Sequence, residues 1–449
     1  MAEPGADGTS GGARGRVTIT GEQDRPSGTV VRRLLRLSIP AILVGVVSAL
    51  ILFAVDEISG LAEDGIWTTL PAALGIDPSA GWWIFGVLSV TGLVVGLILL
   101  LVPGHGGRDS ATTELIAPPL PLKALPSLAL VAVIGLAGGV SLGPENPIIA
   151  INTGILVALL ARLWPAIPPN LVVMLAASAT IGALFGTPVA AALIFTGVVG
   201  TLGGEGALWD KLFLPLLAAA AGSLTMALLA HPSLAVPLPA YDSIAGIDLL
   251  SAAVIAAVAA GLGIAAASVF PALHGAFRML RNPVFYVTLG GILLGILGAV
   301  GGPITLFKGL QQTGELAMNR ADYSAGQLAL IVAVKLVALV IAAAAGFRGG
   351  RIFPAVFIGT AVGVLANALI PSIPVTVAIA AGVMGMVLAI ARDGWIALFI
   401  AVAVAGSITV LAVLCIAILP VWLMVSRAPE MIVHPPAPKS APPLSGAPA

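Results

Sequence analysis

The stretch GLAGGVSLGPENPIIAI, residues 135–151, decides the fold of this chain. It is apolar except for Ser141, Glu145 and Asn146. A carboxylate inside an apolar segment costs several kcal/mol unless it faces water or a partner, so Glu145 is a candidate functional residue. The alternative is a helix-capping Glu at the membrane surface.

The prolines and glycines of this stretch predict a break followed by a helix start. Pro144 and Pro147 disfavour helical backbone in the residues before them, Gly143 and Asn146. Free backbone N–H groups at a helix start form a site for an anion. A Glu in the same place can fill that site itself, as a tethered anion.

Composition places this break in a membrane protein. The 449 residues are 59% hydrophobic and 9% charged, and the mean hydropathy is +1.11, whereas soluble domains are roughly 45–50% apolar and about 25% charged. These values exclude a soluble protein, a disordered chain and a disulfide scaffold. The 20 basic and 20 acidic residues leave no excess charge for binding nucleic acid. We predict an all-α polytopic membrane protein that lies in a lipid bilayer.

The 54 Gly and 34 Pro residues indicate tilted, partial and re-entrant helices. Apolar segments are expected near 37–55, 81–102, 124–138, 147–164, 170–184, 188–200, 212–230, 247–269, 284–300, 326–345, 354–371, 373–391 and 395–424, the last long enough for two helices. One cysteine, Cys415, and four His argue against a disulfide and a metal site.

Charge and composition predict the ends and the topology. Residues 1–28 and the Pro-rich residues 434–449 are expected to be disordered tails. Basic residues before the first span and after the last place both termini in the cytoplasm of a multi-pass cell-membrane protein, and an acidic loop follows the first span. Gly-rich breaks at 135–147 and 346–359 suggest a duplication, with halves at 29–230 and 247–433 joined by an extracytoplasmic linker at 231–246.

Two other breaks carry polar residues. In GFRGGRIFPAVFIG (346–359), Arg348 and Arg351 add positive charge near a helix start, although a cytoplasmic loop would also be basic. In PGHGGRDSATTEL (103–115), His105 and Asp109 flank two Gly before a short helix capped by Asp109 or Ser110, although a His in a Gly loop is usually just solvated.

The remaining intramembrane charges are interpreted as structural. Arg392 and Asp393 are expected to cap a helix end, and Lys335 to snorkel or to pair with an acid. No nucleophile–base pair or cofactor motif is present in the sequence, so we predict neither an enzyme, nor catalytic residues, nor a cofactor.

Taken together, the three breaks resemble the CLC family of chloride channels and transporters, across about residues 30–430. The family pattern GREGP corresponds to Gly143–Pro147, GSGIPE to Gly104–Asp109, and GGIFAP to Gly349–Pro354 with Gly359 following. The resemblance implies a CLC-like inverted repeat of tilted, unequal helices and a homodimer with a pore in each subunit. It also implies that Glu145 is the gating residue, which competes with an anion for the outer site.

The resemblance implies anion-binding positions at the three helix starts and the C-terminal pore position. These are His105, Gly106, Gly107, Gly143, Pro144, Asn146, Arg351, Ile352, Phe353 and Met431. Three of the family's residues are replaced: His105 stands for the pore Ser, where it can donate one N–H to an anion. Met431 stands for the pore Tyr, and Val198 stands for the inner proton-transfer Glu of the exchangers.

From these residues we expect transport of a small inorganic anion, chloride or one similar to it. Passive, channel-like conduction is favoured because Val198 cannot carry a proton. An anion/proton exchanger with an unconventional inner path, a transporter of another solute on this scaffold, and a non-transporting membrane subunit are the alternatives.

Overall fold

The computed structural model describes residues 28–201 and 207–434. Its first half contains α1 (Gly28–Asp64), a π-helical turn (Gly65–Thr69), α2 (Leu70–Leu74), α3 (Gly81–Leu101), α4 (Leu125–Ala137), α5 (Glu145–Leu163), α6 (Pro169–Phe185), α7 (Pro188–Thr201) and α8 (Leu208–Leu229). Its second half contains α9 (Gly246–Arg278), α10 (Pro283–Gly301), α11 (Leu310–Met318), α12 (Ala325–Ala344), α13 (Ile352–Leu369), α14 (Val375–Ala391), α15 (Gly394–Ala405) and α16 (Thr409–Val425).

These helices confirm the predicted all-α membrane fold. Eight helices in the described ranges are long and apolar enough to cross a membrane, and six more apolar helices are shorter. The segment expected at 395–424 divides into two helices at Gly406, whose φ of 62° ends α15. The tails expected to be disordered fall almost entirely on residues 1–27 and 435–449, which lie outside the described residues.

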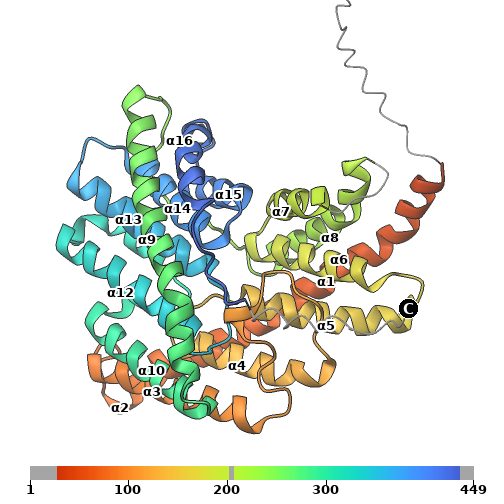
Figure 1. The fold of residues 1–449 in the computed structure, drawn as a ribbon, viewed down its shortest axis with the longest axis horizontal. Helices are drawn as coiled ribbons and strands as arrows, with labels where there is room; N and C mark the ends of the chain where they lie inside the picture. The colour runs from red at the N-terminus through yellow and green to blue at the C-terminus, as the bar shows by residue number, and fades with distance from the viewer. Residues whose placement is uncertain (1–27, 202–206, 435–449) are drawn as a thin grey trace, which may run out of the picture.

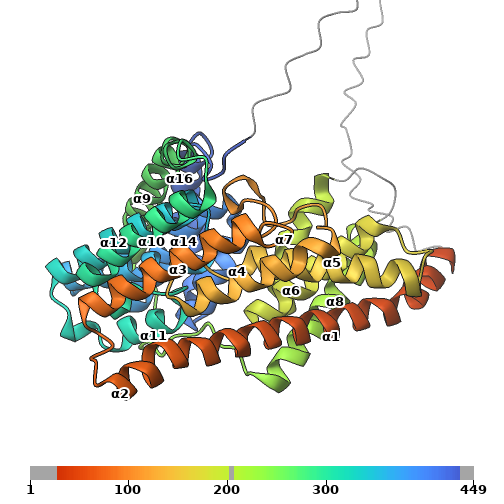
Figure 2. The ribbon, with the colours of Figure 1, turned by 90° about the horizontal axis from the view of Figure 1, so that it is seen from below.

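The packing pattern occurs twice along the chain. In the first half α1 packs on α6 and α8, and α6 packs on α5, α7 and α8. In the second half α9 packs on α14 and α16, and α14 packs on α13, α15 and α16. Figure 1 shows α5–α8 on the right and α9 with α12–α16 on the left, and Figure 2 shows α1 along the edge of the molecule. We propose residues 29–230 and 247–433 as the two repeat units, joined by 231–246.

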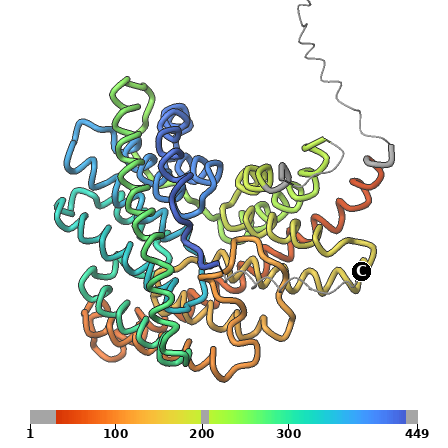
Figure 3. The backbone as a smooth tube through the Cα atoms, viewed as in Figure 1, coloured from red at the N-terminus to blue at the C-terminus, as the bar shows by residue number. Residues whose placement is uncertain are grey.

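The two Gly-rich breaks, one from each half, contact each other. Gly143 and Gly350 form an isolated antiparallel bridge, with Gly143 N–H donating to Gly350 O at 2.8 Å and Gly350 N–H donating to Gly143 O at 2.6 Å. After α16 the chain turns back toward this region (Figure 3), where Val433 N–H donates to Ala111 O at 2.8 Å. The non-helical backbone of each break is therefore paired with backbone from the other half, as a lipid environment requires.

Lys335 neither snorkels nor pairs with an acid, so both expectations for it are wrong. Its side chain is fully buried, and its ammonium group donates to the carbonyl oxygens of Thr305, Leu306 and Phe307 at 2.9, 2.7 and 2.7 Å. An ammonium group has three donors, so these acceptors saturate it. Lys335 thereby fixes the loop before α11 against α12.

The expected cap at Arg392 and Asp393 is confirmed. Asp393 precedes α15, and its carboxylate accepts from the N–H groups of Trp395 at 2.8 Å and Ile396 at 3.0 Å. Arg392 ends α14 with a φ of 59°, and its guanidinium donates to the carbonyls of Val425 and Ala428. The pair therefore turns the chain from one helix into the next and ties the end of α16 to that turn.

Small residues let α13 and α14 approach closely. A Cβ on Gly359 would lie 2.6 Å from Gly382 O, and a Cβ on Gly363 would lie 2.5 Å from Ala378 O. Such spacing of small residues is typical of helix pairs in membranes, where close backbone contact replaces the hydrophobic effect as the source of stability. This pair positions the start of α13, where the site lies.

Substitution of Gly363 by Ala should destabilise the protein by about 1–3 kcal/mol, because the added methyl group has no room between α13 and α14. Thermal unfolding of the purified protein in detergent measures the change. Gly261→Ala in α9 is the matched control, since a Cβ there would meet no atom within 4 Å. Equal melting temperatures for the two variants would contradict the packing argument.

Candidate functional site

Glu145 is the first residue of α5, and its side chain is 1% exposed. The carboxylate crosses to the other half of the molecule, where its Oε1 accepts from the backbone N–H of Phe353 at 2.9 Å. Phe353 is the second residue of α13, so the acceptor lies at the positive end of that helix. The structure therefore holds a tethered carboxylate at a helix start, and the helix belongs to the other half.

Gly143 and Gly350 form a cradle for this carboxylate. An added Cβ on either glycine would collide with Oε2 of Glu145. Neither residue has positive φ, so it is space around the carboxylate, and not backbone conformation, that requires glycine at both positions. The pairing of the two breaks thus leaves a hollow that the Glu145 side chain fills.

The two oxygens of Glu145 differ in their surroundings. Oε1 has the Phe353 donor, while Oε2 is buried and has no hydrogen-bond partner among the described residues. A buried oxygen without a donor carries a cost of about 1–3 kcal/mol. Among the described residues, the carboxylate is therefore held by a single hydrogen bond, through Oε1.

A cavity of about 330 Å³, here called the Arg351 cavity, lies next to this site. Its lining contains two basic residues (Arg351 and Arg392), three acidic residues (Glu114, Asp393 and Glu430) and the neutral amide of Asn146. Ile352 and Met431 are among its apolar lining residues. The structure thus brings Asn146, Arg351, Ile352 and Met431, four of the predicted anion-binding residues, to the wall of a single cavity.

Arg351 places a positive charge at the start of α13. It is the residue before that helix, and its guanidinium lies 5.9 Å from the centre of the Phe270 ring. An arginine side chain keeps its positive charge at neutral pH, so Arg351 gives this part of the cavity wall a positive charge.

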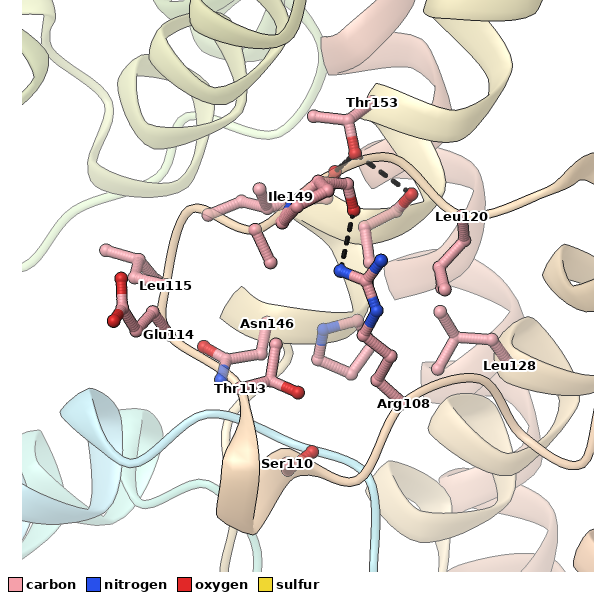
Figure 4. A pocket seen from close by; sticks show the side chains of 14 residues that line it. Arg108, Ser110, Thr113, Glu114, Leu115, Leu120, Leu128, Asn146, Ile149 and Thr153 are labelled. Atoms are coloured by element: carbon pink, nitrogen blue, oxygen red, sulfur yellow. Dashed lines mark hydrogen bonds between the residues drawn. The ribbon is translucent and has the colours of Figure 1, made fainter. Parts of the chain in front are cut away.

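A smaller space adjoins the Arg351 cavity and shares Glu114, Leu115 and Asn146 with it. Figure 4 shows Asn146 beside Thr113 and shows Arg108 extending away from Ser110. Arg108 donates instead to the carbonyl of Pro118 at 2.9 Å. The loop from 108 to 118 therefore lies against the start of α5 and brings Glu114 to the lining of both spaces.

Comparison with known proteins bears on this arrangement of breaks and helix starts. The family model described as "Voltage gated chloride channel" matches residues 91–423. The "Putative ion-transport protein YfeO" of Escherichia coli O6:H1 strain CFT073 is 46% identical over 405 residues, which are 90% of this chain and 96% of that protein. The protein of the same name from Shigella boydii serotype 4 is 46% identical over 92% of this chain and 98% of its own length.

The chain belongs to the CLC family. The fold agrees with two solved members, a CLC-type fluoride/proton antiporter (TM-score 0.70, 18% identity, 89% of this chain and 97% of that chain) and a slow cyanobacterial Cl⁻/H⁺ antiporter (TM-score 0.74, 17% identity, 87% and 94%). At these identities the likeness shows the fold alone. The family membership establishes an ion-transport protein of the anion-transporting CLC type.

The structure places three more of the predicted anion-binding residues, Gly143, Pro144 and Phe353, beside Glu145. Gly143 forms the cradle, and Pro144 is the N-terminal cap residue of α5. Phe353 donates its N–H to Glu145, and its ring lies 5.8 Å from that of Phe185 in α6. The anion-binding role of these residues, like the gating role of Glu145, stays a prediction.

The turn at His105, Gly106 and Gly107 is not part of the Arg351 cavity lining. His105 is exposed, with Nδ1 2.9 Å from Leu99 O, so Nδ1 is the nitrogen that donates there. The Gly106 N–H donates to Ser127 Oγ at 3.1 Å. Val198 belongs to α7, but its side chain lies outside the described residues.

The sequence did not predict that acidic residues would line the Arg351 cavity. Glu114 and Glu430 come from non-helical segments and Asp393 from a helix cap, so no periodic pattern marks them. It also missed that His274 and Arg278, at the end of α9, contact Asp109. The only signal for either residue is its charge within an apolar chain.

Gly350→Ala should expel the Glu145 carboxylate from its cradle, because the new methyl group takes the space of Oε2. Anion flux through the variant should then lose most of its dependence on pH, as measured by efflux from liposomes between pH 4.5 and 7.5. Gly261→Ala, which meets open space, should keep the pH dependence of the unmodified protein. A Gly350→Ala variant with the unmodified pH profile would show that the cradle does not determine the position of Glu145.

Proposed function

We propose that this protein conducts chloride or a similar small inorganic anion through a pathway that Glu145 gates. The observation that carries the proposal is the hydrogen bond from Phe353 N–H to the Glu145 carboxylate. A helix start that binds one tethered anion has the charge and the donors to bind a free one. When the carboxylate leaves, the donors at the start of α13 become available to the anion.

Protonation or displacement of Glu145 opens the pathway. The ionised carboxylate competes with the permeant anion for the same N–H donors, so it blocks the site at high pH. Protonation of Glu145 removes its negative charge, and the positive end of α13 then no longer attracts the side chain. The Arg351 cavity then supplies the anion from the adjoining side, with Asn146 and Ile352 between the cavity and the gate.

Passive conduction is the transport mode that we propose. A proton path across the membrane needs titratable groups or waters on both sides of Glu145, and Val198 occupies the position of the family's inner Glu. No Asp, Glu or His lies between Trp164 and Gly204 in the sequence. Neighbouring residues of the same segment therefore supply no replacement.

Anion/proton exchange is the second candidate, and a specific observation favours it. Glu114, Asp393 and Glu430 line the same cavity as Asn146, the residue directly after Glu145. Carboxylates that line a cavity can deliver protons toward the proposed gate through water. The two structural relatives named above are themselves described as antiporters.

The proposal includes the setting of the protein. Arg32, Arg33 and Arg36 lie at the start of α1, whereas acidic residues follow at Asp56–Asp64 near its end. This asymmetry supports a cytoplasmic N-terminus in the cell membrane, and Arg427 after α16 supports a cytoplasmic C-terminus. A homodimer with one pathway in each subunit follows from the resemblance to other CLC proteins.

Glu145→Gln should raise anion flux about tenfold at neutral pH, because a neutral amide holds a helix start less tightly than a carboxylate does. It should also flatten the rise in flux that we expect of the unmodified protein as pH falls. Efflux from liposomes across a panel of anions, with pH recorded at the same time, measures both effects. Flux and pH response at the unmodified values would refute the gate.

The reversal potential in a planar bilayer separates the two transport modes. Under opposed chloride and pH gradients, passive conduction predicts a potential that follows the chloride gradient alone. A potential that shifts with the pH gradient at fixed stoichiometry would establish exchange instead. Glu114→Gln and His105→Ala would then show which group carries the proton, since only the carrier's loss should abolish the shift.

A further inference from the structure

Asp109 is the centre of a charge cluster that joins three distant parts of the chain. Its Oδ1 accepts from Arg348 Nη1 at 3.2 Å and from Ala111 N–H at 3.1 Å. Its Oδ2 contacts the guanidinium of Arg278 and lies 3.1 Å from His274 Nε2. The carboxylate therefore connects the loop after α3, the end of α9 and the loop before α13.

The ionised form of Asp109 is the one that these contacts stabilise. Burial by itself would raise the pKa of this carboxyl, but the hydrogen bond with His274 and the charges of Arg348 and Arg278 hold the pKa well below its usual range. The Asp109 side chain is 19% exposed and that of Arg348 is 7% exposed. Ion pairs that are largely removed from water are costly to break from one side.

Arg348 carries this connection toward the gate. Its Nε donates to Gly106 O at 3.0 Å, and Nη1 donates to Gly346 O at 3.1 Å as well as to Asp109. These bonds use the fixed fork of a guanidinium, which an ammonium group cannot reproduce. They tie Arg348, two residues before Gly350 of the cradle, to the loop after α3.

Ser110 makes a second contact at the adjacent position. Its Oγ accepts from Gly349 N–H at 3.1 Å, and the residue is 6% exposed. Asp109 and Ser110 thus hold Arg348 and Gly349, two consecutive residues that lead directly into the Gly350–Gly143 bridge. A displacement of this pair moves the cradle, because no residue intervenes between Gly349 and Gly350.

We propose that Asp109, Ser110 and Arg348 form a positioning clamp that sets the Gly349–Gly350 backbone at the depth at which the cradle receives Glu145. This inference rests on the proposed gating role of Glu145. None of the three residues contacts the carboxylate, so each acts through the backbone of 349–350. The clamp strengthens the block at neutral pH by keeping the Phe353 donor and the two glycines in place together.

Two variants test the clamp, and one matched variant serves as control. Ser110→Ala removes only the acceptor of the Gly349 N–H, so we expect it to keep the fold. Arg348→Lys keeps the positive charge but cannot make the several hydrogen bonds of the guanidinium group. Arg108→Ala is the control, because this arginine lies in the same loop but donates only to Pro118 O.

Amide hydrogen exchange followed by mass spectrometry measures how firmly the clamp holds the backbone, independently of transport. Peptides that cover 346–353 should exchange about fivefold faster in Ser110→Ala, as expected for the loss of one hydrogen bond, and at least as fast in Arg348→Lys. Arg108→Ala should leave these peptides unchanged. Exchange in 346–353 that is the same in all four proteins would overturn the clamp.

Flux in liposomes connects the clamp to the gate. At neutral pH, Ser110→Ala should raise anion flux about fivefold toward the Glu145→Gln value, and it should have no further effect in the Glu145→Gln background. An equal increase in both backgrounds would overturn the proposal, since the clamp would then act on the pathway and not through Glu145. Faster exchange together with an inert Glu145→Gln would mean that the gate assignment fails while the clamp still holds the backbone.

Discussion

The pair of hydrogen bonds between Gly143 and Gly350 is the constraint on which the rest of the structure depends. Each glycine belongs to a break in a different half, and a broken helix in a membrane must satisfy its backbone groups within the protein. The two breaks satisfy each other. This brings the starts of α5 and α13 together, so that Glu145 from one half accepts an N–H from the other.

Glu145 and Lys335 are both buried, and each is stabilised by backbone groups of opposite polarity to its own. Glu145 finds a backbone N–H at the positive end of α13, whereas Lys335 finds three carbonyl oxygens in the loop before α11. Lys335 uses all of its donors, which suits a fixed structural role. Glu145 leaves Oε2 without a donor among the described residues, which is consistent with the gating role that we propose for it.

The mixed charge of the Arg351 cavity is the property that separates the two candidate transport modes. Arg351 and Arg392 bring positive charge to its wall, while Glu114, Asp393 and Glu430 bring carboxyl groups. The acids come from non-helical segments and a helix cap, and not from α7, where the resemblance to the CLC exchangers would place an inner Glu. This CLC fold thus places acidic groups near Glu145 from segments that the three motifs do not include.

The sequence by itself determined the membrane class and the positions of the helices and marked Glu145 as a candidate, because apolar runs, Gly–Pro breaks and a lone intramembrane carboxylate are local signals. It also located Asp393 as a cap, which depends on residues next to it in the chain. Only the tertiary structure decided that Lys335 bonds to carbonyls, that Gly143 faces Gly350, and that the turn at His105 lies outside the Arg351 cavity lining. These contacts join residues that are tens to hundreds of positions apart, and their energies depend on how helices pack, which no local pattern encodes.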